Sequence, residues 1–302
     1  MRRRKFLALA AFSAVAGVSG CSADGEGIRV RLASGEVGGL YHAFAQLLSA
    51  VAERESGVRI DPVTTSGSQE NLALLAAGQV DAALALSDSL GESDRVLALG
   101  RVYENYLQLA VHADSPIRRV ADLRGTRVNL GAAGSGAAVT GERLLWAAGV
   151  DPAVDVVIAH RPLREAVAAL ESGDIDALLW AGGVPTGALE VPRRLRLIDL
   201  GELAVPMRER FGYLYDRVEI PADAYPGGPA VRTVGVANLL LAAPSLPDEA
   251  AAAIVDLLVS HADALVPAEA AGTQFLDARS LIGTGSVPLH PGAVSVYRRR
   301  HG

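Results

Sequence analysis

Residues 64–71 combine hydroxyl groups, a glycine and backbone amides at the start of a predicted helix. They read Thr-Thr-Ser-Gly-Ser-Gln-Glu-Asn, after an apolar strand expected over 58–63 and before an apolar helix expected over 68–77. A helix N-terminus presents unpaired N–H groups and partial positive charge, which suits a carboxylate or another small anion. The candidate ligand-binding residues in this segment are Thr65, Gly67, Ser68 and Asn71. The alternative for Ser68 is a simple N-cap, with Asn71 on the exposed face of the helix.

Residue types that support catalysis or metal binding are scarce or badly spaced. Lys5 is the only lysine, so a chain without its leader has none for a Schiff base, pyridoxal phosphate or a P-loop. No two of the six histidines lie four residues apart, which argues against a zinc site. There is no Gly-x-Ser-x-Gly elbow, and Gly-Ser-Gly at 134–136 lacks the remaining glycine of a dinucleotide fingerprint. We therefore expect no catalytic residue, no metal and no cofactor.

Residues 1–20 have the features of an export signal. A basic start precedes an apolar run over 6–18, and Val-Ser-Gly leads to Cys21, the only cysteine. This ending resembles a bacterial lipobox, which implies that Cys21 is lipid-modified and that 21–27 form a lipidated linker. Residues 3–7 also resemble a twin-arginine signal that lacks its upstream polar residue. The alternative for Cys21 is a buried structural cysteine. No cysteine is left for a disulfide framework.

The composition fits a globular protein that does not bind nucleic acid. Half of the 302 residues are hydrophobic and 21% are charged. The formal charge is −6, and loss of the four basic residues of the leader leaves 24 basic against 34 acidic residues, or −10. A nucleic-acid partner would require a basic face. The length allows one large domain or two lobes of ordinary size.

Short apolar strands alternate with amphipathic helices, which predicts an α/β fold. The first of these elements are expected at 28–33, 40–54, 58–63, 68–77 and 81–86.

A weak internal repeat predicts two lobes. The strand and Gly-x-x-Gly turn at 30–38 recur at 127–134, 96 residues later, and Gly-x-x-Asp at 78–81 recurs 95 residues later at 173–176. In such sheets the glycine turns lie at the carboxyl ends of the strands, so two facing lobes would surround one cleft. The alternatives are coincidence for the repeat and ordinary turn geometry for each glycine.

Several short motifs, in order along the mature chain, resemble one known family. They lie at 33–41, 65–71, 121–131, 134–136, 182–185, 220–227, 233–237 and 288–292. They resemble the TAXI family (TRAP-associated extracytoplasmic immunogenic proteins), the substrate-binding subunits of tripartite ATP-independent periplasmic transporters. The resemblance implies an α/β, two-lobed type II periplasmic-binding-protein-like fold with a hinged inter-lobe cleft. Lobe 1 would comprise 28–111 plus 215–302, and lobe 2 would comprise 112–214.

The resemblance also implies further ligand contacts in the cleft. These are Gly39, Tyr41, Ser87, Ser135, Gly136, Ala137, Gly182 and Gly183. Tyr41 has the alternative of a ring packed on the hinge, Trp180 is interpreted as core rather than cleft wall, and Asp88 as a cap or turn residue. Leu86 and Ala137 replace polar residues that are frequent in the family, which leaves the exact ligand open.

Together these features predict a lipid-anchored, monomeric solute-binding protein that faces the periplasm or the cell exterior. Its ligand would be a small carboxylate resembling glutamate or 2-oxoglutarate, and its partners would be TRAP-type membrane permease subunits. One alternative is a binding protein for an ATP-driven importer or a sensor kinase. Another is an enzyme on the same fold, which would need an activated nucleophile or a metal centre.

Overall fold

The computed structural model describes residues 27–301, apart from 92–93, 190–193, 213–214 and 268–275. The expected signal peptide, the lipidation site Cys21 and all but the last residue of the linker lie outside the described residues. Within them, no helix is both long enough and apolar enough to cross a membrane.

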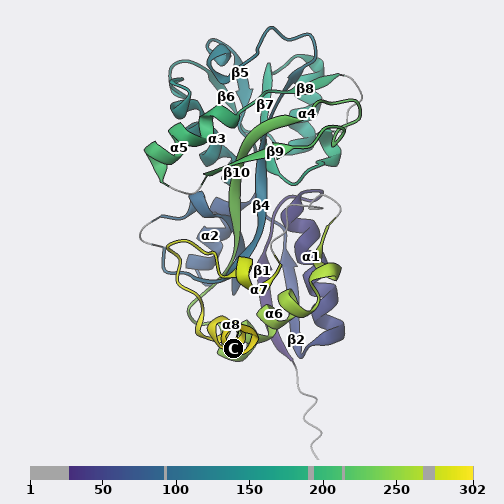
Figure 1. Ribbon diagram of the computed structural model, residues 1–302, viewed down its shortest axis with the longest axis vertical. Coiled ribbons are helices and arrows are strands. Elements are labelled where there is room, and N and C mark those ends of the chain that lie inside the picture. Colours follow the sequence, from purple (N-terminus) through teal and green to yellow (C-terminus); the bar gives the residue numbers. More distant parts are fainter. Residues whose placement is uncertain (1–26, 92–93, 190–193, 213–214, 268–275, 302) are drawn as a thin grey trace, which may run out of the picture.

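The described chain alternates strands and helices as the sequence pattern predicts. The lower half of Figure 1 begins with β1 (Ile28–Ala33), α1 (Leu40–Glu55), β2 (Val58–Val63), α2 (Ser68–Ala76), β3 (Ala82–Leu86) and β4 (Leu97–His112). The upper half contains β5 (Arg127–Asn129), α3 (Gly136–Ala147), β6 (Val157–Ala159), α4 (Leu163–Ser172), β7 (Ala177–Gly182), β8 (Leu195–Leu197), α5 (Ala204–Phe211) and β9 (Tyr215–Ile220). The chain returns through β10 (Val231–Ala242) to α6 (Asp248–Ser260), α7 (Ala278–Leu281) and α8 (Pro291–His301). The five elements expected up to residue 86 are confirmed, with ends that differ by at most one residue.

The strands form one sheet that runs through both halves. Its order is β2-β1-β3-β10-β4-β7-β5-β6, with β9 added to β10 and β8 added to β4. The β1, β2 and β3 strands are parallel, as are β5, β6 and β7, whereas β4 and β10 pair antiparallel with each other. Figure 1 shows β4 and β10 crossing from one half to the other. Their register shifts between Asn238 and Leu239, close to the crossing point.

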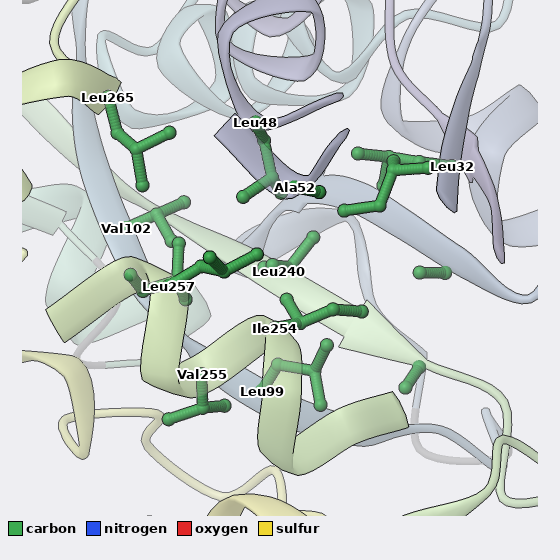
Figure 2. Packing of buried hydrophobic residues seen from close by; sticks show 14 of the residues in the cluster. Leu32, Leu48, Ala52, Leu99, Val102, Leu240, Ile254, Val255, Leu257 and Leu265 are labelled. Atoms are coloured by element: carbon green, nitrogen blue, oxygen red, sulfur yellow. The ribbon is translucent and has the colours of Figure 1, made fainter. Parts of the chain in front are cut away.

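Each half has its own hydrophobic core. In the lower half, α1 and α6 pack on the sheet through residues such as Leu48, Ile254, Leu99 and Leu240 (Figure 2). The other end of β4 and the first part of β10 contribute to the core of the upper half, which also contains Tyr215 of β9.

The two cores therefore meet within β4 and β10, near Asn105 and Asn238. The sequence places the lobe boundaries at 111/112 and 214/215 instead. The difference arises because β4 and β10 are long enough to serve both cores, and because β9, expected in lobe 1, pairs with the upper part of β10.

The internal repeat has a structural counterpart. In the lower half, Arg31 donates from its backbone N and Nε to Asp81 Oδ2, at 2.8 and 3.0 Å, and from Nη2 to Oδ1 at 2.8 Å. In the upper half, Arg127 makes the same three bonds to Asp176, at 2.8, 3.0 and 2.8 Å. Each arginine also donates to the carbonyl of the glycine three residues before its aspartate. The sequence repeat therefore corresponds to the same set of hydrogen bonds in both halves and is not a coincidence of common patterns.

Candidate functional site

An inner cavity of about 50 Å³ lies between the two halves. The lower half contributes Gly35, Glu36, Gly39, Leu40, Tyr41, Ser66, Gly67 and Leu86 to its lining; β4 contributes Asn105; and the upper half contributes Ser135, Gly136, Ala137, Trp180 and Ala181. An outer cavity of about 490 Å³ lies beside it, and Glu36, Gly39 and Trp180 line both. The two cavities are therefore adjacent and share part of their lining.

Half of the predicted ligand-binding residues line the inner cavity. These are Gly39, Tyr41, Gly67, Ser135, Gly136 and Ala137. Thr65 lines the outer cavity, whereas Ser68, Asn71, Ser87, Gly182 and Gly183 line neither. Trp180, interpreted from the sequence as core, is buried and also lines both cavities. The structure thus brings together residues that are about a hundred positions apart in the sequence.

Two helices from opposite halves begin at the inner cavity. The N-cap of α1 is Gly39, which has no side chain to satisfy the amides of the first turn. The N-cap of α3 is Ser135, whose Oγ accepts a hydrogen bond from Ala138 N at 3.2 Å. Both helices are long enough to carry a substantial dipole. Each of these helix starts therefore offers partial positive charge and backbone N–H groups that suit an anionic group.

The start of α2 has a different role from the one expected. The backbone N–H groups of Gln69 and Glu70 donate to the carbonyl of Gly134, at 3.0 and 3.2 Å. Gly134 belongs to the upper half, so these two amides of the segment 64–71 join the two halves. The sequence could not show this, because the acceptor comes from the other half.

Asn71 is a buried bridge within the lower half. Its Nδ2 donates to the carbonyls of Ser34 and Leu84, at 2.6 and 2.7 Å, and its Oδ1 accepts from Thr65 Oγ1 at 2.6 Å. The side chain is fully buried, so it does not lie on an exposed helix face. Its polar atoms are occupied by the loops that follow β1 and β2 and by β3, leaving none for a ligand.

Ser68 is also buried away from the cavities, and Ser87 is half-buried and lines neither of them. Ser68 Oγ accepts from Leu86 N at 3.0 Å and lies 3.4 Å from Tyr41 Oη, and the N-cap position of α2 is Gly67. The Ser87 Oγ atom is buried and has no partner among the described residues.

Tyr41 connects the cavity to the two crossing strands. Its hydroxyl donates to Asn238 Oδ1; Asn238 Nδ2 donates to Asn105 Oδ1 at 2.5 Å; and Asn105 Nδ2 donates to the carbonyl of Ala181 at 3.2 Å. Burial raises the pKa of Tyr41, so the phenol stays neutral and acts as a donor. Sequence reasoning missed both asparagines, although polar amides within apolar strands were a usable signal.

Glu36 is the charged residue that sequence reasoning missed. Among the described residues that line the inner cavity, it has the only charged side chain. Its Oε2 accepts from the backbone N of Leu163, at the start of α4 in the other half, at 3.1 Å. Its Oε1 is buried and has no hydrogen-bond partner among the described residues. Burial raises the pKa of Glu36, and the nearby charge of Glu165 raises it further.

A third polar contact joins the halves at Asp88. Its Oδ2 accepts from Thr140 Oγ1 at 2.7 Å and from Tyr215 Oη at 3.0 Å, and its carbonyl accepts from Arg143 Nη1 at 2.6 Å. Burial raises the pKa of Asp88, whereas the hydrogen bond from Thr140 and the charge of Arg143 oppose that shift. Asp88 lies in the short helical turn 87–89 and also bonds to the other half. Within the described residues, no group of three or more His, Cys, Asp or Glu side chains could hold a metal ion.

Comparison with known proteins places the chain in a family. The NMT1-like family model matches residues 32–300, which is most of the chain. The protein belongs to the NMT1-like family. Among solved structures it resembles a protein of Bordetella bronchiseptica RB50, with a TM-score of 0.57 and 16% identity over 92% of this chain and 99% of that one. It also resembles a putative L-cystine ABC transporter protein from Listeria monocytogenes, with a TM-score of 0.55 and 16% identity over 83% and 99% of the two chains.

A third similar structure is the effector-binding domain of QuiR in complex with shikimate, with a TM-score of 0.51 and 12% identity over 78% and 97% of the two chains. At these identities the similarity shows the fold. The α/β, two-lobed fold predicted from the sequence is confirmed. Those neighbours with a functional name are a transporter protein and a ligand-binding domain rather than enzymes.

The assignment to the TAXI family is wrong. The matching family is NMT1-like, and the named transporter relative is of the ABC type, not the TRAP type. The motifs behind that assignment are mostly glycine turns and junctions between strands and helices. Two facing βαβ lobes need such turns in any protein of this architecture, so the motifs indicate the fold and do not identify the family.

Proposed function

We propose that this protein is an extracytoplasmic solute-binding protein of an ABC-type importer and that its ligand carries a small anionic group. The observation that carries the proposal is the meeting of the α1 and α3 N-termini, one from each half, at a single cavity. The fold shared with the Listeria protein supports the ABC-type importer. A carboxylate between two helix starts would accept backbone N–H bonds from both halves.

Binding would favour closure of the halves, with β4 and β10 as the hinge. A ligand that touches both halves binds the closed form better than the open form, so it shifts the population toward closure. Contacts that already join the halves are the amides of α2 with Gly134, Glu36 with Leu163, and Asp88 with Thr140. The closed form would then be the surface that the membrane subunits recognise.

Export and attachment belong to the same proposal. The leader over 1–20 would direct secretion, and lipid on Cys21 would tether a monomer to the outer face of the cell membrane. Labelling of the full-length chain with a fatty-acid analogue, and loss of that label in Cys21→Ala, would test the anchor. An unlabelled wild-type chain would contradict it.

The ligand proposal is tested with protein that starts at residue 22. Thermal unfolding is measured with carboxylates, amino acids and neutral sugars, and the compounds are assayed afterwards for turnover. We expect an acid to stabilise the protein without being consumed, by about 2.7 kcal/mol at a hundred times its Kd. Equal stabilisation by sugars and acids would contradict anion capture, and consumption of the compound would indicate an enzyme.

A further inference from the structure

The inner cavity combines two electropositive helix starts with one carboxylate. Glu36 Oε2 is occupied by Leu163 N, but Oε1 is buried with no hydrogen-bond partner. No cationic side chain lies within 4 Å of either oxygen among the described residues. A buried carboxylate oxygen without a donor is costly, so native proteins retain one mainly where something else supplies the donor. An anionic ligand alone would make this worse, because it adds a second negative charge beside the first.

The charged neighbours of Glu36 lie in the outer cavity. Glu165 is close enough to raise the pKa of Glu36, and it lines the outer cavity, as does Arg164. The Arg164 guanidinium lies near Gly38, because a Cβ atom built on that glycine would be 3.6 Å from Arg164 Nη2. Glu36 lines both cavities, whereas Glu165 and Arg164 line only the outer one, and the described lining residues provide no cation inside the inner cavity.

We propose that Glu36 binds a positively charged N–H group of the ligand, which is therefore a zwitterion with an amino group close to its acid group. This inference rests on the proposed function and names the class of ligand for the same site. The acid group would accept N–H bonds at the starts of α1 and α3, and the amino group would donate to Glu36 Oε1. The contact with Leu163 fixes the carboxylate in position for this role.

The cavity volumes fit such a ligand. A buried water needs about 10–15 Å³, so about 50 Å³ holds only a few water-sized groups. That is room for an acid group and an amine on one carbon, but not for a long side chain. The rest of the ligand would pass Trp180 into the outer cavity of about 490 Å³.

The test compares matched acids that differ only at the amino group. Wild-type protein and Glu36→Gln are titrated calorimetrically with L-glutamate against 2-oxoglutarate, and with L-alanine against pyruvate. Glutamine keeps an oxygen that can accept from Leu163 N but loses the charge, so the contact between the halves is retained. We expect wild type to prefer the amino acid of a pair by about ten- to hundredfold, and Glu36→Gln to lose that preference. Glu53→Gln, at an exposed position of α1 outside both cavity linings, is the matched control and should keep the preference.

Two results would overturn the inference. One is a wild-type protein that binds the oxo acid as tightly as the amino acid. The other is an equal weakening of both acids by Glu36→Gln, which would show that Glu36 only closes the halves. Circular dichroism and the thermal midpoint confirm that each variant is folded.

Failure of the proposed function would give results that differ from failure of this inference. If no acid binds but ethanolamine does, and Glu36→Gln weakens it, the anionic group is wrong while the role of Glu36 stands. If none of these probes binds wild type, both proposals fail.

Discussion

An alanine at Gly136 should hold the two halves apart. Gly136 is the first residue of α3, and a Cβ built on it would lie 2.5 Å from Ser68 Oγ and 2.7 Å from Leu86 Cδ1, both in the opposite half. Overpacking of this kind costs about 1–3 kcal/mol. Because the cost arises only when the halves meet, it would weaken ligand binding by about 5- to 150-fold.

The assay combines calorimetric titration with small-angle X-ray scattering. The ligand is the compound that most stabilises wild type in the panel described above. Wild type should contract on binding, whereas Gly136→Ala should stay extended and bind more weakly. Gly57→Ala is the matched control, because its new methyl group would meet nothing within 4 Å and Gly57 does not adopt a left-handed conformation. Alanine is also well accepted in a helix, so the Gly136 variant should remain folded.

The reasoning is refuted if Gly136→Ala binds the ligand with wild-type affinity and contracts as wild type does. The halves would then close without bringing α3 against Ser68. A loss of affinity shared by Gly57→Ala would equally remove the argument.

Three further predictions concern stability. Asn71→Ala removes three buried hydrogen bonds. The free energy of unfolding in urea should therefore fall by about 2–4 kcal/mol, and a loss below about 1 kcal/mol would contradict this. Burial raises the pKa of Asp88 in the folded protein. The stability of wild type relative to Asp88→Asn should therefore be greatest below the unfolded pKa of about 3.9 and be lost as pH rises through the folded pKa. Urea titrations from about pH 3 to 8 that give a constant difference would refute this. The hydrogen bonds from Arg31 and Arg127 lower the pKa of Asp81 and of Asp176. Asp81→Asn and Asp176→Asn should therefore lower the urea midpoint equally at pH 7, and this loss should fade as pH falls through the lowered pKa values. Unequal shifts of the midpoint would contradict the equivalence of the two halves.

Sequence patterns predicted the elements well because each depends on neighbouring residues. The alternation of apolar strands and amphipathic helices gave β1 to β3 with ends within a residue of those observed. The arginine and aspartate of the repeat, 96 and 95 residues apart, adopt the same geometry in both halves. The pairing of β4 with β10 could not be predicted, because the apolar pattern of a strand does not specify which other strand it pairs with.

The site was predictable only to the level of helix starts. The glycine turns predicted a cleft between two sets of helix starts, and the structure places the starts of α1 and α3 at one cavity. Which amides remain available depends on how the halves meet, and the Gly134 carbonyl occupies those of α2. Similarly, the side chain of Asn71 could not be assigned to a bridge until Ser34 and Leu84 were placed around it. Glu36 was overlooked because a single acid in a glycine turn has no distinctive spacing.

The sharing of β4 and β10 bears on how the molecule unfolds. Each of these strands places buried side chains in both cores, so melting of one core removes two strands from the other. Heat or urea should therefore produce one cooperative transition without a half-folded intermediate. For the same reason, neither half should fold when it is expressed as a separate fragment. Each fragment would lack buried side chains of β4 or β10 that complete its core.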